Sequence, residues 1–134
     1  LIYAIGHRSG GQINCAVTFG LCLAGKLGPV QGIVNFAAQC IGSIAPRRRR
    51  PLQTTLASNV VAPGYDNVQV FEVETIMTFV LVYVVLETAT NTKTAANRVL
   101  APLAIGLAVF IGHSILIPID GCSINPTRSL GPAL

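Results

Sequence analysis

The sequence of 134 residues contains no tryptophan and few charged residues. Aspartate, glutamate, lysine and arginine together make up 10% of it, whereas about a quarter of an ordinary soluble domain is charged. Hydrophobic residues make up 51%, and the mean hydropathy is +0.63. This balance favours a membrane protein, with a very apolar soluble fragment as the alternative. The length allows one domain at most.

The cysteines show none of the spacings that are typical of metal sites. Cys15, Cys22, Cys40 and Cys122 include no Cys-x-x-Cys pair, and no histidine stands at ligand spacing from them. We therefore expect no metal, no cofactor and no disulfide framework. A nucleophile, a base and an orienting group do not occur together either, which argues against an enzyme.

The net charge of +4 comes mostly from one run, Arg47–Arg50. Four arginines without interleaved aromatic residues usually form a solvated loop, so we expect no nucleic-acid partner. Residue 1 is not methionine, and no charged segment with a cleavage site is visible, so the sequence predicts no signal peptide. Both ends lie in apolar sequence, and we expect an incomplete chain.

Apolar runs predict three membrane spans and two shorter helices. The predicted spans are residues 29–45, 68–86 and 99–119. A helix needs about 20 apolar residues to cross the hydrocarbon, so the first span is at the short limit. Residues 13–24 and 121–134 are shorter apolar stretches that suit re-entrant half-helices. Because the runs are continuous and do not alternate, we expect no β-structure.

One short motif occurs twice with the same offset of 111 residues, as from Asn14 to Asn125. The matched pairs are Gly10 with Gly121, Ile13 with Ile124, Asn14 with Asn125, Thr18 with Ser129 and Gly20 with Gly131. Interrupted helices at corresponding positions of two halves are a sequence pointer to the substrate pathway of a membrane protein. Irregular backbone at membrane depth survives where it lines a cavity, so we expect the two half-helices to meet there.

The two asparagines stand where each half-helix would begin. A helix N-terminus presents unpaired N–H groups and partial positive charge, and an asparagine oxygen can cap it. The side-chain N–H groups of Asn14 and Asn125 would then donate to a passing water. Two donors at one level would interrupt a hydrogen-bonded water chain. The alternative is that both asparagines only cap their helices.

With Ser-Gly-Gly-Gln before the first motif and Arg-Ser-Leu-Gly-Pro-Ala after the second, the pair resembles the signature boxes of the aquaporin (major intrinsic protein) family. The resemblance covers residues 1–44 and 56–134. It implies an all-α, multi-pass integral membrane protein in a lipid bilayer, an inverted-repeat helical bundle with two re-entrant half-helices. Of the family's six spans this chain would hold about three, with residues 1–45 ending the first repeat, 46–67 connecting and 68–134 forming the second. A homotetramer is implied as well.

The resemblance also implies the site residues. The boxes are Asn14-Cys15-Ala16 and Asn125-Pro126-Thr127; the selectivity filter includes His113, Cys122 and Arg128; the pore-lining carbonyls belong to Gly10, Gly11, Gln12, Gly121, Cys122 and Ser123; and Glu74 braces a re-entrant loop. Cys15 and Thr127 depart from the family's proline and alanine. The Arg47–Arg50 run stands where the family's third helix continues, on the side that the positive-inside rule disfavours.

By this resemblance the function is passive, single-file conduction of water. His113 and Ser129 match water-selective members, because glycerol-conducting members have a small residue and an aspartate at these positions. A channel for glycerol or another small neutral solute, or a non-conducting membrane-embedded fragment, remains the alternative. We also expect the thiol of Cys122 to be reachable from the water path and to be the main target of mercurials, with Cys15 as its rival.

Overall fold

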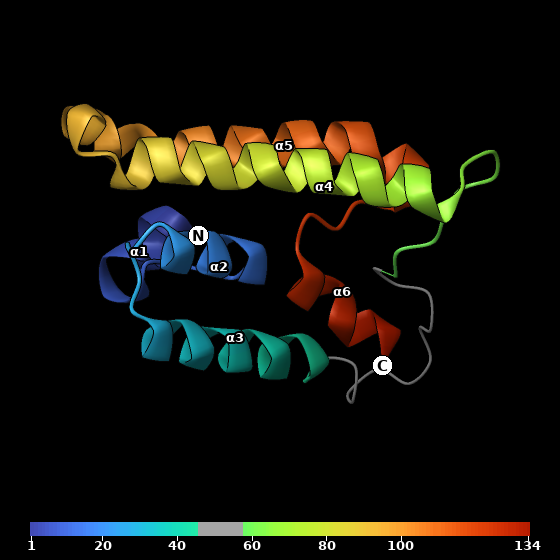
Figure 1. The fold of residues 1–134 in the computed structure, drawn as a ribbon, viewed down its shortest axis with the longest axis horizontal. Coiled ribbons are helices and arrows are strands. Elements are labelled where there is room, and N and C mark those ends of the chain that lie inside the picture. The colour runs from blue at the N-terminus through green and yellow to red at the C-terminus, as the bar shows by residue number, and fades with distance from the viewer. Residues whose placement is uncertain (46–57) are drawn as a thin grey trace.

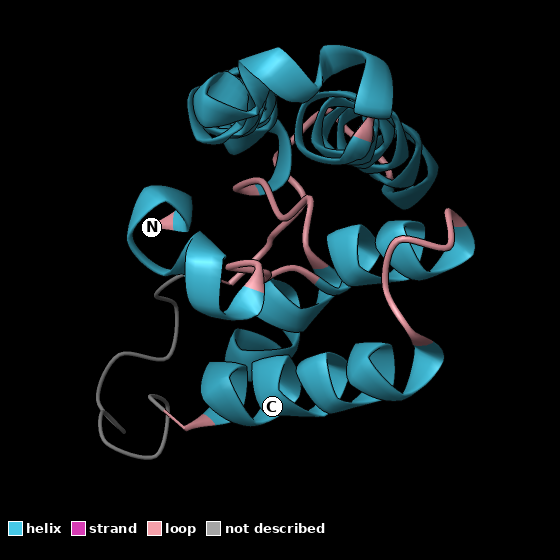
Figure 2. Ribbon diagram, turned by 90° about the vertical axis from the view of Figure 1, so that its left-hand side faces the viewer, coloured by secondary structure: helices cyan, strands magenta, loops and turns pink. Residues whose placement is uncertain are grey.

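The computed structural model describes residues 1–45 and 58–134, and every regular element in these residues is a helix (Figures 1 and 2). The helices are α1 (Ile2–Ser9), α2 (Cys15–Leu23), α3 (Pro29–Ile44), α4 (Asn67–Val85), the π-helical turn η2 (Leu86–Thr90), the 3-10 helix η3 (Thr92–Leu100), α5 (Ala101–Asp120) and α6 (Pro126–Ala133). The predicted all-helical fold with two short half-helices, α2 and α6, is therefore confirmed. The expectation for Arg47–Arg50 lies outside the described residues.

Two helical segments are long and apolar enough to cross a bilayer within the described residues, Asn67–Thr90 and Arg98–Asp120. Only 11% and 28% of their most apolar windows are buried, so neither resembles the core helix of a soluble protein. The third predicted span is α3, whose 16 residues reach about 24 Å at 1.5 Å per residue. Its described part thus falls short of the hydrocarbon thickness, as the length of its apolar run indicated.

Local side chains decide where several helices begin and end. Asp66 accepts hydrogen bonds from the backbone of Val68 and Gln69 at 2.8 and 2.9 Å, and the Gln69 side chain accepts from the Asp66 N–H at 3.1 Å, which is a capping box that starts α4. Pro29 occupies the first turn of α3, where its missing N–H costs nothing. Gly121 ends α5 with a φ of 88°, a left-handed conformation that glycine adopts without steric cost.

The helices form layers (Figure 1). α4 and α5 lie side by side along one edge, α3 lies along the opposite edge, and α2 and α6 lie between them. α2 packs against both α3 and α4, while α6 packs against α3. The shared core is formed by buried side chains of α4, α5, α2 and the loop after α5, including Leu81, Val85, Ile105, Leu116, Val17 and Ile124.

The repeated glycines explain how the half-helices fit between these layers. A methyl group added at Gly20 of α2 would lie 2.5 Å from Val82 Cγ1 of α4. A methyl group added at Gly131 of α6 would overlap the backbone of Ser43 in α3. Each half-helix therefore packs closely, through its glycine, on a helix of the other half of the chain.

Candidate functional site

The N-termini of the two half-helices meet, and each asparagine reaches across to the other repeat. Asn14 Nδ2 donates to the carbonyl of Ile124 at 2.7 Å, and Asn125 Nδ2 donates to the carbonyl of Ile13 at 2.8 Å. The two bonds are reciprocal, because each asparagine binds the residue that precedes its counterpart. This confirms that the segments starting at Asn14 and Asn125 are short helices with adjoining N-termini.

The oxygens of both asparagines cap their own helices. Asn14 Oδ1 accepts from the N–H groups of Ala16 at 2.9 Å and Val17 at 3.5 Å. Asn125 Oδ1 accepts from the Arg128 N–H at 3.4 Å and from the hydroxyl of Thr127 at 2.7 Å. With one amide hydrogen used in the crossing bond, each asparagine keeps one further hydrogen to donate.

The hydroxyl of Thr127 gives the second box a contact that the first lacks. Thr127 is buried and bonds the asparagine of its own box, whereas Ala16 offers only its backbone. Pro126 stands at the exposed first turn of α6, and Cys15 begins α2 at the matching place. Both boxes therefore form capped helix starts despite the two sequence departures.

The loop between α5 and α6 has an unusual backbone. Cys122 and Ile124 have φ values of 58° and 43°, in the left-handed region that costs non-glycine residues about 1–3 kcal/mol each. Glu74 of α4 accepts hydrogen bonds from the N–H groups of Ser123 at 2.5 Å and Ile124 at 2.6 Å. A carboxylate that binds two adjacent N–H groups stabilises this conformation, because hydrogen bonds to charged groups are strong.

Arg128 lies in the first turn of α6 and is held by the loop that precedes α4. Its Nη1 donates to Asn59 Oδ1 at 2.8 Å. Asn59 Nδ2 in turn donates to the Asp120 carboxylate at 3.1 Å. The sequence analysis found neither Asn59 nor Asp120. A carboxylate at the end of an otherwise apolar run is the signal that could have identified Asp120, whereas nothing local distinguishes Asn59.

His113 lies on α5 next to Gly112, which faces the α5–α6 loop at Ile124. The His113 Nδ1 atom lies 2.9 Å from the carbonyl of Val109. A carbonyl can only accept, so Nδ1 carries the hydrogen and the neutral ring presents Nε2 as an acceptor. The ring is partly buried. In this tautomer Nε2 is the atom of His113 that can accept a further hydrogen bond.

The burial of Cys122 contradicts one expectation. Cys122 is 0% exposed, so its thiol is not reachable from open space in this structure. The reachable thiol predicted for this residue was wrong, whereas its places in the filter and among the pore-lining carbonyls stay predictions. The cause is the left-handed turn at Cys122, whose N–H bonds the Asp120 carboxylate at 3.0 Å within the core. Cys15, which is half-buried, is the more accessible thiol of the two.

The other predicted pore carbonyls lie on the two loops that lead into the half-helices. On the first loop Gly10 is exposed, Gly11 is buried, and the carbonyl of Gln12 accepts from Gln39 Nε2 at 3.3 Å. On the second loop Gly121 and Ser123 are partly exposed. Each loop leads directly into one of the two crossing asparagines.

A family comparison agrees with this geometry. The model of the family described as major intrinsic protein matches residues 1–134, the whole chain. The chain belongs to the major intrinsic protein family. Members of this family are integral membrane proteins, as the apolar helices α4 and α5 indicate. The predicted aquaporin resemblance is confirmed.

Several curated relatives are plant aquaporins. The chain is 43% identical over 145 residues to the probable aquaporin PIP1-2 of Oryza sativa subsp. japonica and 44% identical over 145 residues to aquaporin PIP1-3 of Arabidopsis thaliana. Both alignments cover 100% of this chain and 50% of the relative. The chain therefore spans about half the length of the curated relatives that it matches.

A solved structure shares the fold. The X-ray structure of the aquaglyceroporin from Plasmodium falciparum matches with a TM-score of 0.79 and 21% sequence identity, over 96% of this chain and 58% of that chain. At this identity the match shows the aquaporin-like fold alone. It confirms the helical bundle that the sequence predicted.

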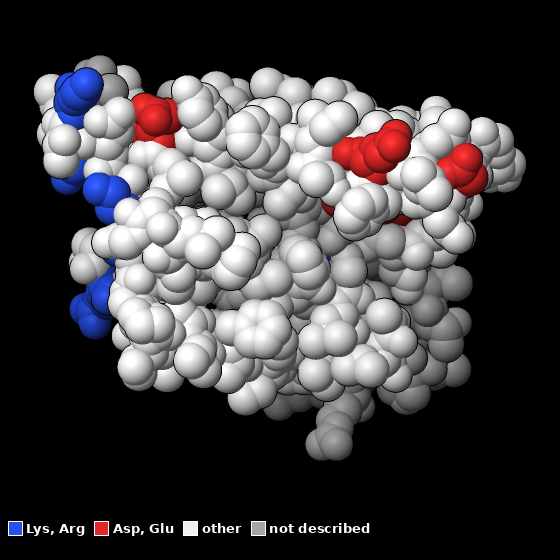
Figure 3. All heavy atoms as spheres, viewed as in Figure 1, with Lys and Arg blue, Asp and Glu red and all other residues white. Residues whose placement is uncertain are grey.

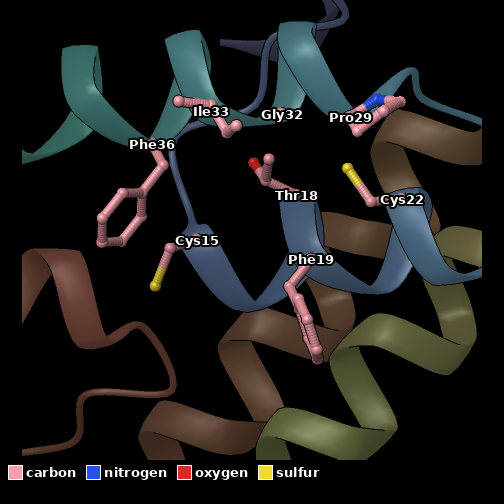
Figure 4. A pocket seen from close by; sticks show the side chains of 8 residues that line it. All are labelled: Cys15, Thr18, Phe19, Cys22, Pro29, Gly32, Ile33 and Phe36. Carbon is pink, nitrogen blue, oxygen red and sulfur yellow. The ribbon is translucent and has the colours of Figure 1, made fainter.

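A cavity of about 300 Å³ lies between α2 and α3 of this aquaporin-family chain. Residues of both helices line it, and Figure 4 shows Thr18 and Cys22 pointing from α2 toward α3, whereas Phe19 points away from α3. Its lining is apolar apart from the thiols and the buried hydroxyl of Thr18, which is already bonded to Gln12 at 3.0 Å. The cavity is a gap between apolar helix faces and not a polar pathway.

Among the described residues, the side of the molecule seen in Figure 3 has a wide face without charged side chains. Exposed cations gather at one end of the molecule, where α1 ends and α4 connects to α5: Arg8, Lys26, Lys93 and Arg98. The acidic groups visible in Figure 3 lie over α4 and over the connection that follows it. A broad uncharged face of this kind fits a protein whose sides contact lipid.

Proposed function

We propose that the protein that contains this chain is a passive channel for water, with the paired asparagines at its centre. The observation that carries this proposal is the reciprocal pair of hydrogen bonds at 2.7 and 2.8 Å that joins Asn14 and Asn125 to the opposite repeat. These bonds fix two helix N-termini and two amide donors at one level. A site with only donors at its centre suits a small neutral molecule that can accept two hydrogen bonds.

The chemistry of this level explains how water could pass without a continuous hydrogen-bonded chain. Each amide retains one hydrogen, and the N-termini of α2 and α6 carry partial positive charge. A water oxygen is attracted to both donors, so its own hydrogens point away from the centre and cannot bridge the two halves of the path. The same partial charge disfavours cations.

His113 and Arg128 support water over glycerol as the permeant. Arg128 is a fixed donor because Asn59 holds it at 2.8 Å, and His113 offers the acceptor Nε2. A histidine ring also occupies volume that glycerol, with its three carbons and three hydroxyls, would need. The names of the curated plant relatives agree with a water channel. A homotetramer in the bilayer belongs to the same proposal.

Osmotic swelling of vesicles tests this function. The full-length protein would be reconstituted into lipid vesicles and exposed to an osmotic step, with protein-free vesicles as the control. We expect water permeability well above that of the control and glycerol permeability equal to it. Glycerol flux comparable to water flux would favour a neutral-solute channel, and water flux no greater than the control would favour a non-conducting membrane protein.

A further inference from the structure

Asn59 lies between a buried carboxylate and the cation of the filter. On one side its Oδ1 accepts from Arg128 Nη1 at 2.8 Å and from Ser129 Oγ at 2.6 Å. On the other side its Nδ2 donates to Asp120 Oδ2 at 3.1 Å and to the Asp120 carbonyl at 3.3 Å. Both ends of the amide are therefore used.

Asp120 is buried, and both of its carboxylate oxygens accept hydrogen bonds. The residue is 5% exposed, and its other carboxylate oxygen accepts from the Cys122 N–H at 3.0 Å. Two backbone bonds fix the loop beside it, from Val60 N–H to the Asp120 carbonyl at 3.0 Å and from Ala62 N–H to the Ile119 carbonyl at 2.8 Å. Asn59 is thus presented to α6 by a loop that is pinned to the end of α5.

An amide is the group that this position requires. A guanidinium can only donate hydrogen bonds and an ionised carboxylate can only accept them, so a side chain between the two must accept on one side and donate on the other. The partners also fix the orientation of the amide, because the reversed amide would face Arg128 with N–H groups and Asp120 with an oxygen. Neither contact could then form.

We propose that Asn59 and Asp120 are positioning residues for the filter. Asp120 fixes the amide of Asn59, and Asn59 holds the guanidinium of Arg128 against the loop before α4, clear of the single-file path. This inference rests on the proposed water channel. Without the anchor, the long Arg128 side chain samples conformations that cross the path, and the wall that it forms is no longer fixed.

Exchanging the two side chains tests the bridge. In Asn59→Asp alone, two carboxylates face each other; in Asp120→Asn alone, two amides compete and Arg128 loses its acceptor. In the double variant Asn59→Asp/Asp120→Asn the bonds between side chains can form again, because a carboxylate at position 59 accepts from Arg128 and from the new amide at position 120. Only the bond from residue 59 to the backbone carbonyl of residue 120 is lost. The net charge of the double variant is that of the wild type.

We expect each single variant to lower water permeability per channel at least threefold and to raise the ratio of glycerol to water permeability at least threefold. The double variant should return both values to within twofold of the wild type. Both values are taken after the permeability of protein-free vesicles is subtracted, so their ratio does not depend on the number of folded channels and a merely structural defect would leave it unchanged. The matched control is Asn67→Asp, the same change at an exposed residue of α4, which should alter neither value.

Two results would overturn the inference while the water channel stands. One is a single variant whose ratio of glycerol to water permeability equals that of the wild type. The other is a double variant whose water permeability and permeability ratio are no better than those of the worse single variant. If wild-type vesicles swell no faster than protein-free ones, the proposed function fails instead. The thermal unfolding midpoints then test the contact between Asn59 and Asp120. Each single variant should lower the midpoint and the double variant should restore it; a double variant whose midpoint is not restored would refute the contact.

Discussion

The close approach of α6 to α3 makes Gly131 sensitive to a single methyl group. In Gly131→Ala the added carbon would lie 2.7 Å from the carbonyl carbon of Ser43, whereas carbon atoms pack best about 3.5–4.0 Å apart. The two helices must separate by about 1 Å to accept it. That movement also breaks the bond from the Gly131 N–H to Ser43 Oγ, which is 3.0 Å long.

The expected magnitude follows from three opposing contributions. Overpacking costs about 1–3 kcal/mol, and the lost hydrogen bond costs about 1 kcal/mol. Alanine regains about 1 kcal/mol because it is a better helix former than glycine. We therefore expect Gly131→Ala to lower the free energy of unfolding by about 1–3 kcal/mol.

Gly42→Ala is the matched control, because Gly42 lies beside Ser43 in α3 and a methyl group there meets nothing within 4 Å. It should stabilise the protein by up to about 1 kcal/mol. The assay is equilibrium unfolding in detergent micelles, followed by far-ultraviolet circular dichroism. If Gly131→Ala proves as stable as Gly42→Ala, the close packing of α6 on α3 is refuted.

Three further outcomes are expected. Glu74→Gln removes one of the two oxygens that accept from the loop of Ser123, together with the charge, and should lower the free energy of unfolding by about 2 kcal/mol; an unchanged unfolding curve would show that Glu74 does not stabilise this loop. His113→Gly should raise the ratio of glycerol to water permeability several-fold in the vesicle assay, and a ratio equal to the wild type would show that the ring does not narrow the path. In the folded protein a mercurial should label Cys15 and spare Cys122 until unfolding, as mass spectrometry of the labelled peptides can check; early labelling of Cys122 would show that its burial is lost in solution.

The sequence predicted the features that depend on neighbouring residues. Hydropathy marks α4 and α5, because a helix that contacts lipid must be apolar over a fixed length. The repeated asparagines mark the starts of α2 and α6, because capping involves residues only two or three positions away. The apolar runs gave spans at residues 68–86 and 99–119 with no helix between them, whereas the structure has η2 and η3 there. Local bonds cause this difference, such as those from Thr88 Oγ1 to the Val84 carbonyl at 2.6 Å and from Lys93 N–H to Asn91 Oδ1 at 2.9 Å.

Only the tertiary structure decided which distant groups meet. Asn14 and Ile124 are 110 residues apart, and Asn59 and Arg128 are 69 apart. The repeated motif predicted that the two half-helices meet, but not which atoms bond, and no pattern pointed to the contact of Asn59 with Arg128, because these contacts depend on how the layers pack. The same holds for Cys122, whose short distance from the box in sequence suggested exposure. A left-handed turn directs it into the core instead, and the direction of a side chain is a property of the folded backbone and not of sequence distance.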